Sequence, residues 1–401
     1  MFVYFHNQAD KLKKSTRVIP ITLITLLVLG RLSFGEFDFS HFIVAGTDFV
    51  DPSSVPSEII VIDGQGYDGQ FFYRLANNPL DTSKTSFGVT LDHIEYRMQR
   101  IVYPILVWTL SAGGYPGLIP FMLVLCNALG FIGIFFISQK ICIKHRIHLR
   151  LYLLPIFLFG AFMALARDTS EIIEVFLFVL AVYLLFERKK LALFIGVSIL
   201  MVFTRETSVL ALLPILFLYG IHQLKTNGLN RNSILRMIAI TIPPLVLALW
   251  RYSLHKVIAS EDLTSTHQNL ALPFSGLLYG ATQNTNVDTL KNVLESIFWY
   301  ALLTWNIWLT FIVFKQINYR KLLTYKIDSA LGISYVSWGV LAIFLGPGIY
   351  VDDWAYVRVF SLWNMIGFLL LMLNNKPVSR PFILYSTLLL APLLVRLIVR
   401  V

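Results

Sequence analysis

The chain has 401 residues, of which 56% are hydrophobic and only 14% are charged, and its mean hydropathy is +0.69. These values exclude an ordinary soluble globular protein and predict a polytopic membrane protein. The formal net charge of +10 would point to nucleic acid in a soluble domain, but here the basic residues lie in short loops between apolar segments. We therefore expect membrane lipid, and no nucleic acid, as a partner. The two cysteines, Cys126 and Cys142, imply no disulfide framework.

Twelve apolar stretches follow one another along the chain, and each is a candidate membrane helix. They cover residues 18–34, 101–110, 117–137, 151–166, 172–186, 191–203, 208–221, 237–254, 297–314, 331–345, 359–373 and 382–395. Neither an internal repeat nor a separate soluble segment interrupts them. We expect an all-α transmembrane protein with about 11 spans, forming a single domain over residues 1–401, in which residues 101–397 hold the helices after the first outward loop.

The amino terminus is expected in the cytoplasm, because Lys11, Lys13, Lys14 and Arg17 precede the first span at 18–34. This flank resembles a signal peptide, but no small-residue cleavage motif follows it, so we interpret the segment as an uncleaved anchor. Residues 36–99 then form an extracytoplasmic loop, which we expect to contain short helices along the membrane surface.

The stretch 101–110 is half the length that a spanning helix needs, roughly twenty residues. If it crossed, the basic loop at 140–150 would lie outside, against the charge rule. We predict instead that it dips in and returns at residues 113–116. The basic loops at 140–150, 187–190, 225–236, 315–326 and 376–380 then lie inside, and the segments 167–171, 205–207, 260–295 and 350–358 lie outside.

Clusters that mix acids with arginines thus all fall on the extracytoplasmic face. Charges at the ends of membrane helices are costly unless they are paired or solvated, so several such clusters on one side indicate a shared polar cavity. The alternative is interfacial ion pairing with no functional role.

The stretch from Ile60 to Leu80, IVIDGQGYDGQFFYRLANNPL, is the main candidate for the site itself. Its glycines allow sharp backbone turns, and Asp63 and Asp68 place two carboxylates five positions apart. Helical periodicity begins at Asp68 and ends at the Asn-Asn-Pro run at residues 77–79. Asp68 is therefore either a functional carboxylate or simply the N-cap of a short helix.

A polar site on the outer face of a membrane protein is suited to lipid-linked substrates, because nucleotide-activated sugars and ATP are not expected outside the cytoplasm. Guanidinium groups bind phosphate oxygens in a planar fork, and the candidates for this role are Arg97, Arg100, Arg205 and Arg358. Asp68 is the best candidate for a base that accepts a proton from a sugar hydroxyl, and Asp63 is the second. Aromatic residues beside Asp68 would stack on sugar rings.

The motifs of several other chemistries are absent from the sequence, namely zinc-ligand spacing, a Walker lysine loop and a Gly-x-Ser-x-Gly elbow. No cofactor is required by default. A divalent cation remains an alternative, held through the oxygens of Asp63 with Asp68 or of Asp352 with Asp353.

The run YDGQFFYRLA at residues 67–76, after a first span and inside an outward loop, resembles the GT-C superfamily of membrane glycosyltransferases. It is similar in particular to the aromatic-Asp motif of PIG-V-like mannosyltransferases and to the YDGQFYY signature of bacterial cell-surface glycopolymer membrane proteins. The run from Tyr96 to Pro104 is similar to the first-loop region of those enzymes.

The resemblance implies a bacterial inner-membrane enzyme that takes a sugar from a polyprenyl-phosphate donor and transfers it with inversion to a surface glycan or lipid-linked acceptor. It places Asp68 at the catalytic aspartate. The residues expected to bind substrate are Tyr67, Gln70, Tyr73, Arg97, Arg100, Arg167, Asp168, Arg205, Glu206 and Arg358. Two other classes stay open: a transporter or flippase for lipid-linked saccharides, and a structural partner in a glycan-assembly complex.

Overall fold

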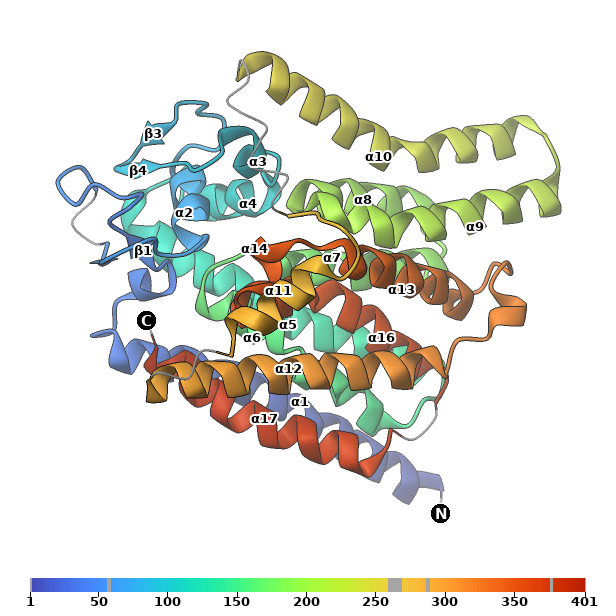
Figure 1. Ribbon diagram of the computed structural model, residues 1–401. Helices are drawn as coiled ribbons and strands as arrows, with labels where there is room; N and C mark the ends of the chain where they lie inside the picture. Colours follow the sequence, from blue (N-terminus) through green and yellow to red (C-terminus); the bar gives the residue numbers. More distant parts are fainter. Residues whose placement is uncertain (1, 56–58, 259–268, 286–288, 376–377, 401) are drawn as a thin grey trace.

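Helices account for most of the chain in the computed structural model, which describes residues 2–55, 59–258, 269–285, 289–375 and 378–400 (Figure 1). The long helices are α1 (Phe2–Phe34), α5 (Ile119–Lys144), α9 (Val209–Asn227), α10 (Arg231–Val257), α12 (Leu290–Phe314), α13 (Ile327–Phe344), α16 (Ser361–Leu373) and α17 (Arg380–Val399). The shorter ones are α2 (Gly69–Asn77), α3 (Ile94–Met98), α4 (Val102–Leu110), α6 (Phe159–Ala166), α7 (Glu171–Val182), α8 (Leu191–Thr204), α11 (Ser275–Gln283), α14 (Pro347–Tyr350) and α15 (Asp353–Val359).

Tighter and wider helical turns connect these elements. The 3₁₀ turns are η1 (Phe39–Phe42), η2 (Pro116–Leu118), η3 (Leu149–Phe157), η5 (Glu206–Ser208) and η7 (Tyr319–Lys321), and η4 (Tyr183–Glu187) is a π-helical turn at the end of α7. The strands are two residues each: β1 (Ala45–Gly46) pairs in parallel with β2 (Val61–Ile62), and β3 (Thr85–Ser86) pairs antiparallel with β4 (Val89–Thr90).

The prediction of a helical membrane protein is confirmed, but the count of about eleven spans is not. Within the described residues, six helices are long and apolar enough to cross a membrane, namely α10, α12, α13, α17, α5 with η2, and α9 with η5. The pair α15 and α16, bent by 47°, makes a seventh if taken as one span. The sequence count treated every apolar stretch except 101–110 as a crossing. However, α6 and α7 have only 8 and 12 residues, and they are apolar because the bundle buries them.

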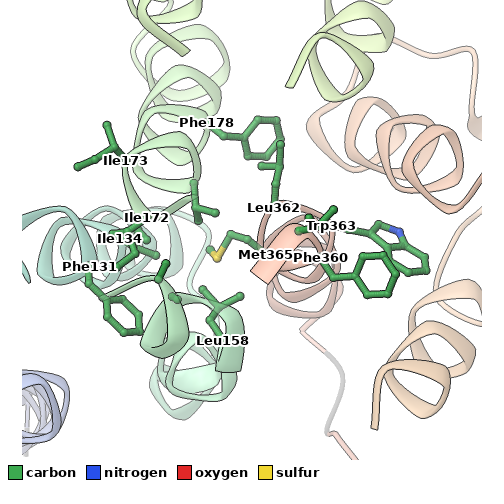
Figure 2. Close-up of a cluster of buried hydrophobic side chains, with 14 of the residues drawn as sticks. Phe131, Ile134, Leu158, Ile172, Ile173, Phe178, Phe360, Leu362, Trp363 and Met365 are labelled. Carbon is green, nitrogen blue, oxygen red and sulfur yellow. The ribbon is translucent and has the colours of Figure 1, made fainter. Parts of the chain in front are cut away.

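The hydrophobic core lies between α5, α7 and α16. Phe131 on α5, Phe178 on α7 and Met365 on α16 are all fully buried there (Figure 2). Helix α7 packs against α5, α8 and α16, and α16 also packs against α12 and α13. These two helices therefore connect the amino-terminal and carboxy-terminal halves of the bundle.

The first and last helices of the chain are joined by a buried arginine. Arg31, near the end of α1, is 1% exposed and donates hydrogen bonds to three backbone carbonyls. Its Nη1 lies 2.8 Å from the oxygen of Leu397 and 2.7 Å from that of Arg400, and its Nη2 lies 2.7 Å from that of His41. The guanidinium thus satisfies carbonyls at the end of α17, which have no partner within that helix.

The outward loop predicted at 36–99 folds into a small module that carries α2 and both strand pairs, seen at the left of Figure 1. Gly64 and Gly66 adopt φ of 97° and 62°, which only glycine tolerates well, as the turn prediction required. Gly69 serves close packing instead, because a Cβ there would lie 2.5 Å from the carbonyl oxygen of Arg167. All nine residues of α2 are buried, so α2 is not a helix lying on the surface.

The short stretch predicted to dip and return forms α4, which has nine residues and packs against α2. The turn that follows contains Ala112, Gly113 and Gly114, all with positive φ. A Cβ on Gly114 would lie 2.4 Å from the carbonyl oxygen of Asn77, at the end of α2. The turn therefore lies beside the loop module, and α4 does not carry the chain to the far end of the bundle. The predicted outward segment 260–295 lies partly outside the described residues.

Substitution of Trp305 on α12 tests how much the packing of the bundle depends on one aromatic side chain. It is fully buried, its ring contacts Phe159, Phe368 and Phe382, and its Nε1 donates to Ser386 Oγ at 2.8 Å. We expect Trp305→Ala to cost about 3–5 kcal/mol through the cavity that it leaves. Ser386→Ala removes two neutral hydrogen bonds, the one from Trp305 and the one to the carbonyl of Phe382, together worth about 2 kcal/mol. Thermal unfolding in detergent measures both, and a larger loss of Tm for Ser386→Ala would contradict this assignment.

Candidate functional site

Asp68 occupies the N-cap position of α2, but its carboxylate does not cap the helix. Its backbone is already helical (φ −57°, ψ −24°), and its side chain accepts no capping hydrogen bond. The two carboxylate oxygens instead contact two arginines that are distant in sequence. Arg97 Nη1 lies 2.9 Å from Oδ1, and Arg358 Nη2 lies 2.6 Å from Oδ2. The N-cap alternative therefore does not account for the carboxylate.

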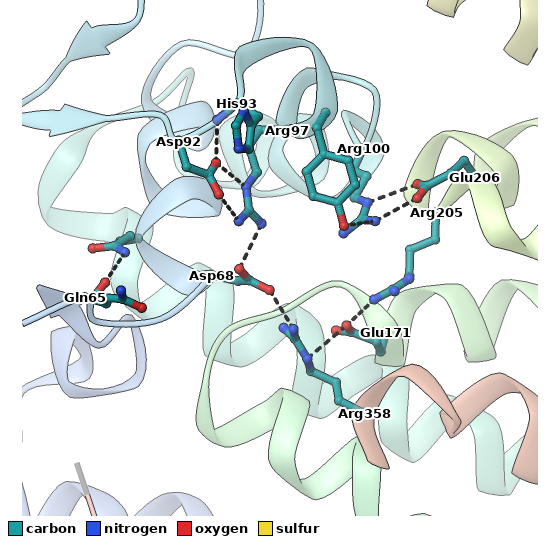
Figure 3. Close-up of polar contacts among 12 residues, drawn as sticks. Gln65, Asp68, Asp92, His93, Arg97, Arg100, Glu171, Arg205, Glu206 and Arg358 are labelled. Atoms are coloured by element: carbon teal, nitrogen blue, oxygen red, sulfur yellow. Dashed lines mark hydrogen bonds and ion pairs between the residues drawn. The ribbon is translucent and has the colours of Figure 1, made fainter. Parts of the chain in front are cut away.

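Both arginines extend the contact into a chain of ion pairs, drawn in Figure 3. Arg97 also holds Asp92, with distances of 2.8 Å from Nε and 2.6 Å from Nη2. Arg358 Nε lies 3.2 Å from a carboxylate oxygen of Glu171. Glu171 accepts in turn from Arg205, so acids and arginines alternate across the site.

Two further carboxylates complete this assembly. Arg205 Nε lies 3.5 Å from Glu174. Arg100 binds Glu206 in a bidentate manner, with Nε 3.0 Å from one oxygen and Nη2 2.7 Å from the other. The hydroxyl of Tyr96 also accepts from Arg100 at 2.6 Å. We call the whole set the acid–arginine network: Asp68, Asp92, Tyr96, Arg97, Arg100, Glu171, Glu174, Arg205, Glu206 and Arg358.

The network brings together segments from the loop module, from the starts of α7 and α9, and from α15. Of the predicted site residues it contains Asp68, Arg97, Arg100, Arg205, Glu206 and Arg358. Sequence reasoning missed Asp92, Tyr96, Glu171 and Glu174 as members. Glu171 belonged to a mixed cluster that had been recognised, whereas Asp92 lies five residues before Arg97, ahead of α3, and this proximity was visible but was not used.

The ion pairs set the protonation state of Asp68, whose side chain is 23% exposed. Burial alone would raise the pKa of this carboxyl, but the charges of Arg97 and Arg358 outweigh it and hold the pKa well below its usual range. The carboxylate is therefore ionised at neutral pH. While both guanidinium groups hold it, it is a weak base.

Arg167 differs from the network arginines because no carboxylate partner is found for it within the described part of the chain. It is 5% exposed, and its guanidinium carbon lies 5.5 Å from the ring centre of Tyr67 and 4.4 Å from that of Trp354. Burial, and after it the charge of Arg31, lowers the pKa of Arg167 to about 9, so the group stays charged at neutral pH. A buried charge without a counter-ion is costly, and an anionic ligand would relieve that cost.

The ring of Trp354 also contacts two arginines at the carboxyl end of α17. The guanidinium carbons of Arg396 and Arg400 lie 4.8 Å and 5.6 Å from its ring centre. Both arginines bind Glu295, and Arg396 also binds Asp353. This group lies next to the network, because Arg167 contacts both Trp354 and Tyr67, and the guanidinium of Arg358 lies 4.8 Å from the Tyr67 ring.

Asp352 is a second carboxyl of interest beside this group. It caps α15 by accepting from the backbone nitrogen of Trp354 at 3.1 Å. Burial, reinforced by the neighbouring Asp353, raises the pKa of Asp352 to about 7, which matches a group that exchanges protons near neutral pH. The sequence had pointed to Asp352 only as half of a possible cation site with Asp353. In the part of the chain that the structure describes, no three His, Cys, Asp or Glu side chains gather to hold a metal ion.

Four other predicted site residues lie outside the network. Asp63 is exposed and makes no ion pair with any described residue. Gln70 connects backbone segments of the loop, accepting from Gly46 N at 3.0 Å and donating to Gln65 O at 2.9 Å. The ring of Tyr73 is part of the core. Asp168 is fully buried with φ of 48°, and burial raises its pKa well above the ordinary value against the opposing charge of Arg31.

An apolar groove with a volume of about 850 Å³ opens beside the network. Its walls come from α4, α5, α7 and α8, with Leu80 of the loop module and Trp250 of α10. Three of its lining residues are close in the chain to members of the network: Ile101 follows Arg100, Ile173 lies between Glu171 and Glu174, and Phe203 lies two residues before Arg205. The groove therefore runs from the polar site along the apolar body of the bundle, and its chemistry suits a hydrocarbon chain.

Comparisons with protein-family models, with curated proteins and with solved structures find no match to this chain.

The depressed pKa of Asp68 predicts how its ion pairs respond to acid. A carboxyl whose folded-state pKa lies below the unfolded value of about 3.9 contributes stability that is complete above that pH and is lost as the pH falls. The Tm difference between the wild type and Asp68→Asn should therefore be constant from pH 8 to pH 5 and shrink at pH 3. A difference that already closes between pH 8 and pH 6 would show that the carboxyl is not held by the two arginines.

Proposed function

We propose that this chain is a GT-C-type glycosyltransferase of a bacterial inner membrane. It transfers a sugar from a polyprenyl-phosphate donor to a surface glycan or lipid-linked acceptor on the extracytoplasmic face. The observation that carries the proposal is the position of Asp68, held between Arg97 and Arg358 and close to the buried Arg167, to which the described residues offer no carboxylate partner. The motif around Asp68 resembles that superfamily, and GT-C-like architecture with about 11 membrane segments is part of the proposal.

The lipid part of the donor is the first requirement, and the apolar groove supports it. A polyprenyl chain needs a long hydrocarbon surface next to a polar site, and the lining of the groove of about 850 Å³ includes Ile101, one residue after Arg100. A soluble sugar phosphate would have no use for this surface. The groove therefore favours a lipid-linked substrate over a free one.

The phosphate is the second requirement, and Arg167 is the cation best placed to attract it. The network has four arginines against five carboxylates, so taken as a whole it adds no positive charge. Arg396 and Arg400 near Trp354 are paired with Glu295 and Asp353, so the positive character of this region comes from Arg167. A phosphate bound there could then draw Arg358 away from Asp68.

The third requirement is a base, and the ion pairs of Asp68 determine how strong a base this carboxylate is. The acceptor hydroxyl oxygen forms a bond to the anomeric carbon as the bond from that carbon to the phosphate oxygen breaks, and Asp68 takes the hydroxyl proton. Asp68 becomes a stronger base once the donor phosphate competes for its arginines, because its pKa then rises toward the ordinary value. Stacking on Tyr67 would orient a sugar ring at this place.

The second candidate is a flippase for lipid-linked saccharides, and one observation favours it. A carboxylate that is held by two guanidinium groups is a weak base, and a transporter needs no base. The two functions differ in what the loss of the Asp68 carboxylate should do.

Asp68→Asn should lower transfer by about a hundredfold to ten-thousandfold while donor affinity stays nearly unchanged, because a base acts in the transition state. The assay uses purified protein with a polyprenyl-phosphate sugar, and turnover and donor binding are measured separately. Asp63→Asn is the matched control, since Asp63 is exposed and outside the network. Asp68→Ser retains a good N-cap residue, so wild-type transfer by Asp68→Ser would remove Asp68 from the mechanism. Asp63 and Asp352 would then be the next carboxyls to test.

Arg167→Gln should weaken donor binding by about tenfold or more, because hydrogen bonds to charged groups are worth about 1.5–3 kcal/mol. Arg167→Lys should restore binding only in part, since it keeps the charge but loses the fork. Unchanged donor affinity in Arg167→Gln would exclude Arg167 from the phosphate site.

The orientation of the chain is tested by labelling single cysteines with a membrane-impermeant thiol reagent in spheroplasts. With Cys126 and Cys142 replaced, Thr82→Cys and Lys84→Cys should react from outside, because both side chains are exposed in the loop module. Cysteines at Lys190 and Lys225 should react only after lysis. The opposite pattern would place the acid–arginine network on the cytoplasmic side.

A further inference from the structure

A second polar cavity lies at the opposite end of the bundle from the acid–arginine network. Its volume is about 390 Å³, and it is bounded by η4, α8, α9, α10 and the segment before α13. Along α9, Glu206 and His222 are separated by about 24 Å at 1.5 Å per residue. The polar side chains that line the cavity are Lys189, Tyr219, His222, Gln223, Arg236 and Tyr325.

Aromatic packing gives the cavity one firm wall. The Tyr325 ring stacks on His222, with ring centres 4.4 Å apart and planes at 17°, and meets Tyr219 edge to face at 5.6 Å. Phe186 packs against the same ring at 5.3 Å. The wall is therefore fixed from three sides, unlike a loop that is free in solvent.

The π-helical turn at the end of α7 places Lys189 at the cavity. The π-helical segment Tyr183–Glu187 is followed by Lys189 with φ of 53°, and the backbone nitrogen of Lys190 returns to the carbonyl of Leu184 at 2.9 Å. Such wide turns occur frequently at functional sites. The turn brings the charge of Lys189 to the cavity that Arg236 approaches from α10.

The lining side chains include two cations, Lys189 and Arg236, whereas the hydroxyls of Tyr219 and Tyr325 and the imidazole of His222 can donate or accept. The Gln223 side-chain oxygen is already occupied, because Arg236 Nη1 and Asn227 Nδ2 both donate to it at 3.0 Å. This leaves the Gln223 amide nitrogen to donate, together with the guanidinium of Arg236 and the ammonium of Lys189. No carboxylate lines the cavity, and Arg236 has no acidic partner among the described residues. The matching ligand is an anion that carries several acceptor oxygens.

We propose that this cavity binds the phosphate group of an anionic phospholipid headgroup. The lining supplies two cations and additional donors, and the neighbouring helix surfaces are apolar, as a ligand with both a phosphate and acyl chains requires. Free inorganic phosphate shares the recognised chemistry and is the other possible source. The proposal is independent of glycosyl transfer, since it uses no residue of the network.

The experiment measures phospholipid binding to delipidated, detergent-purified protein by native mass spectrometry. Phosphatidylglycerol should bind at least tenfold more tightly than phosphatidylcholine, and Lys189→Ala with Arg236→Ala should remove that preference. The matched control is Lys190→Ala with Lys225→Ala, which removes the same charge from exposed positions next to Lys189 and at the end of α9, both outside the cavity. The control should change the affinity less than twofold.

Two further arms identify the source of the phosphate and guard against misfolding. Competition by inorganic phosphate at millimolar concentration would assign the site to free phosphate, and failure to compete assigns it to the lipid headgroup. Arg236→Lys preserves the charge and should retain most of the preference. Equal affinity for the two lipids in the wild type, or an equal loss in the cavity variant and its control, would overturn the proposal.

Discussion

The contact on which the site depends is the ion pair that Asp68 makes with two arginines from distant parts of the chain. Arg97 lies in the loop module and Arg358 lies in α15, so a single carboxylate joins the module to the carboxy-terminal half of the bundle. The continuation through Glu171 connects the start of α7 to the same point. A membrane protein that places this many charges at its helix ends must pair them, and here the pairing also determines how strong a base Asp68 is.

Part of this site was readable from the sequence, because charge patterns decide which loops share a face. The clusters at 167–171, 205–207 and 350–358 were expected on one side, and Glu171, Arg205 and Arg358 do meet in one network. Which acid holds which arginine was not readable, since pairing depends on tertiary distances. The isolation of Arg167 could not be predicted either, because its sequence neighbours Asp168 and Glu171 look like natural partners.

The fold likewise combines features set by local sequence, which could be predicted, with features set by tertiary packing, which could not. Hydropathy located the helices but could not distinguish a lipid-facing helix from a core helix, so the short, buried α6 and α7 were counted as crossings. The turn glycines were predicted by residue type, and Gly64 and Gly66 do have positive φ. Gly69 was expected for the same reason, but it is required by the approach of a backbone 98 residues further along the chain. Only the folded structure reveals that requirement.

The contact between Arg31 and the end of α17 has a consequence for how the bundle comes apart. Arg31 donates to the carbonyl of His41, ten residues away, and to those of Leu397 and Arg400, 366 and 369 residues away. Separating α1 from α17 would leave a buried guanidinium and two carbonyls with fewer hydrogen-bond partners, which is unfavourable. The two helices are therefore expected to detach together, so that neither can be peeled away by detergent or by a pulling force while the other stays in place.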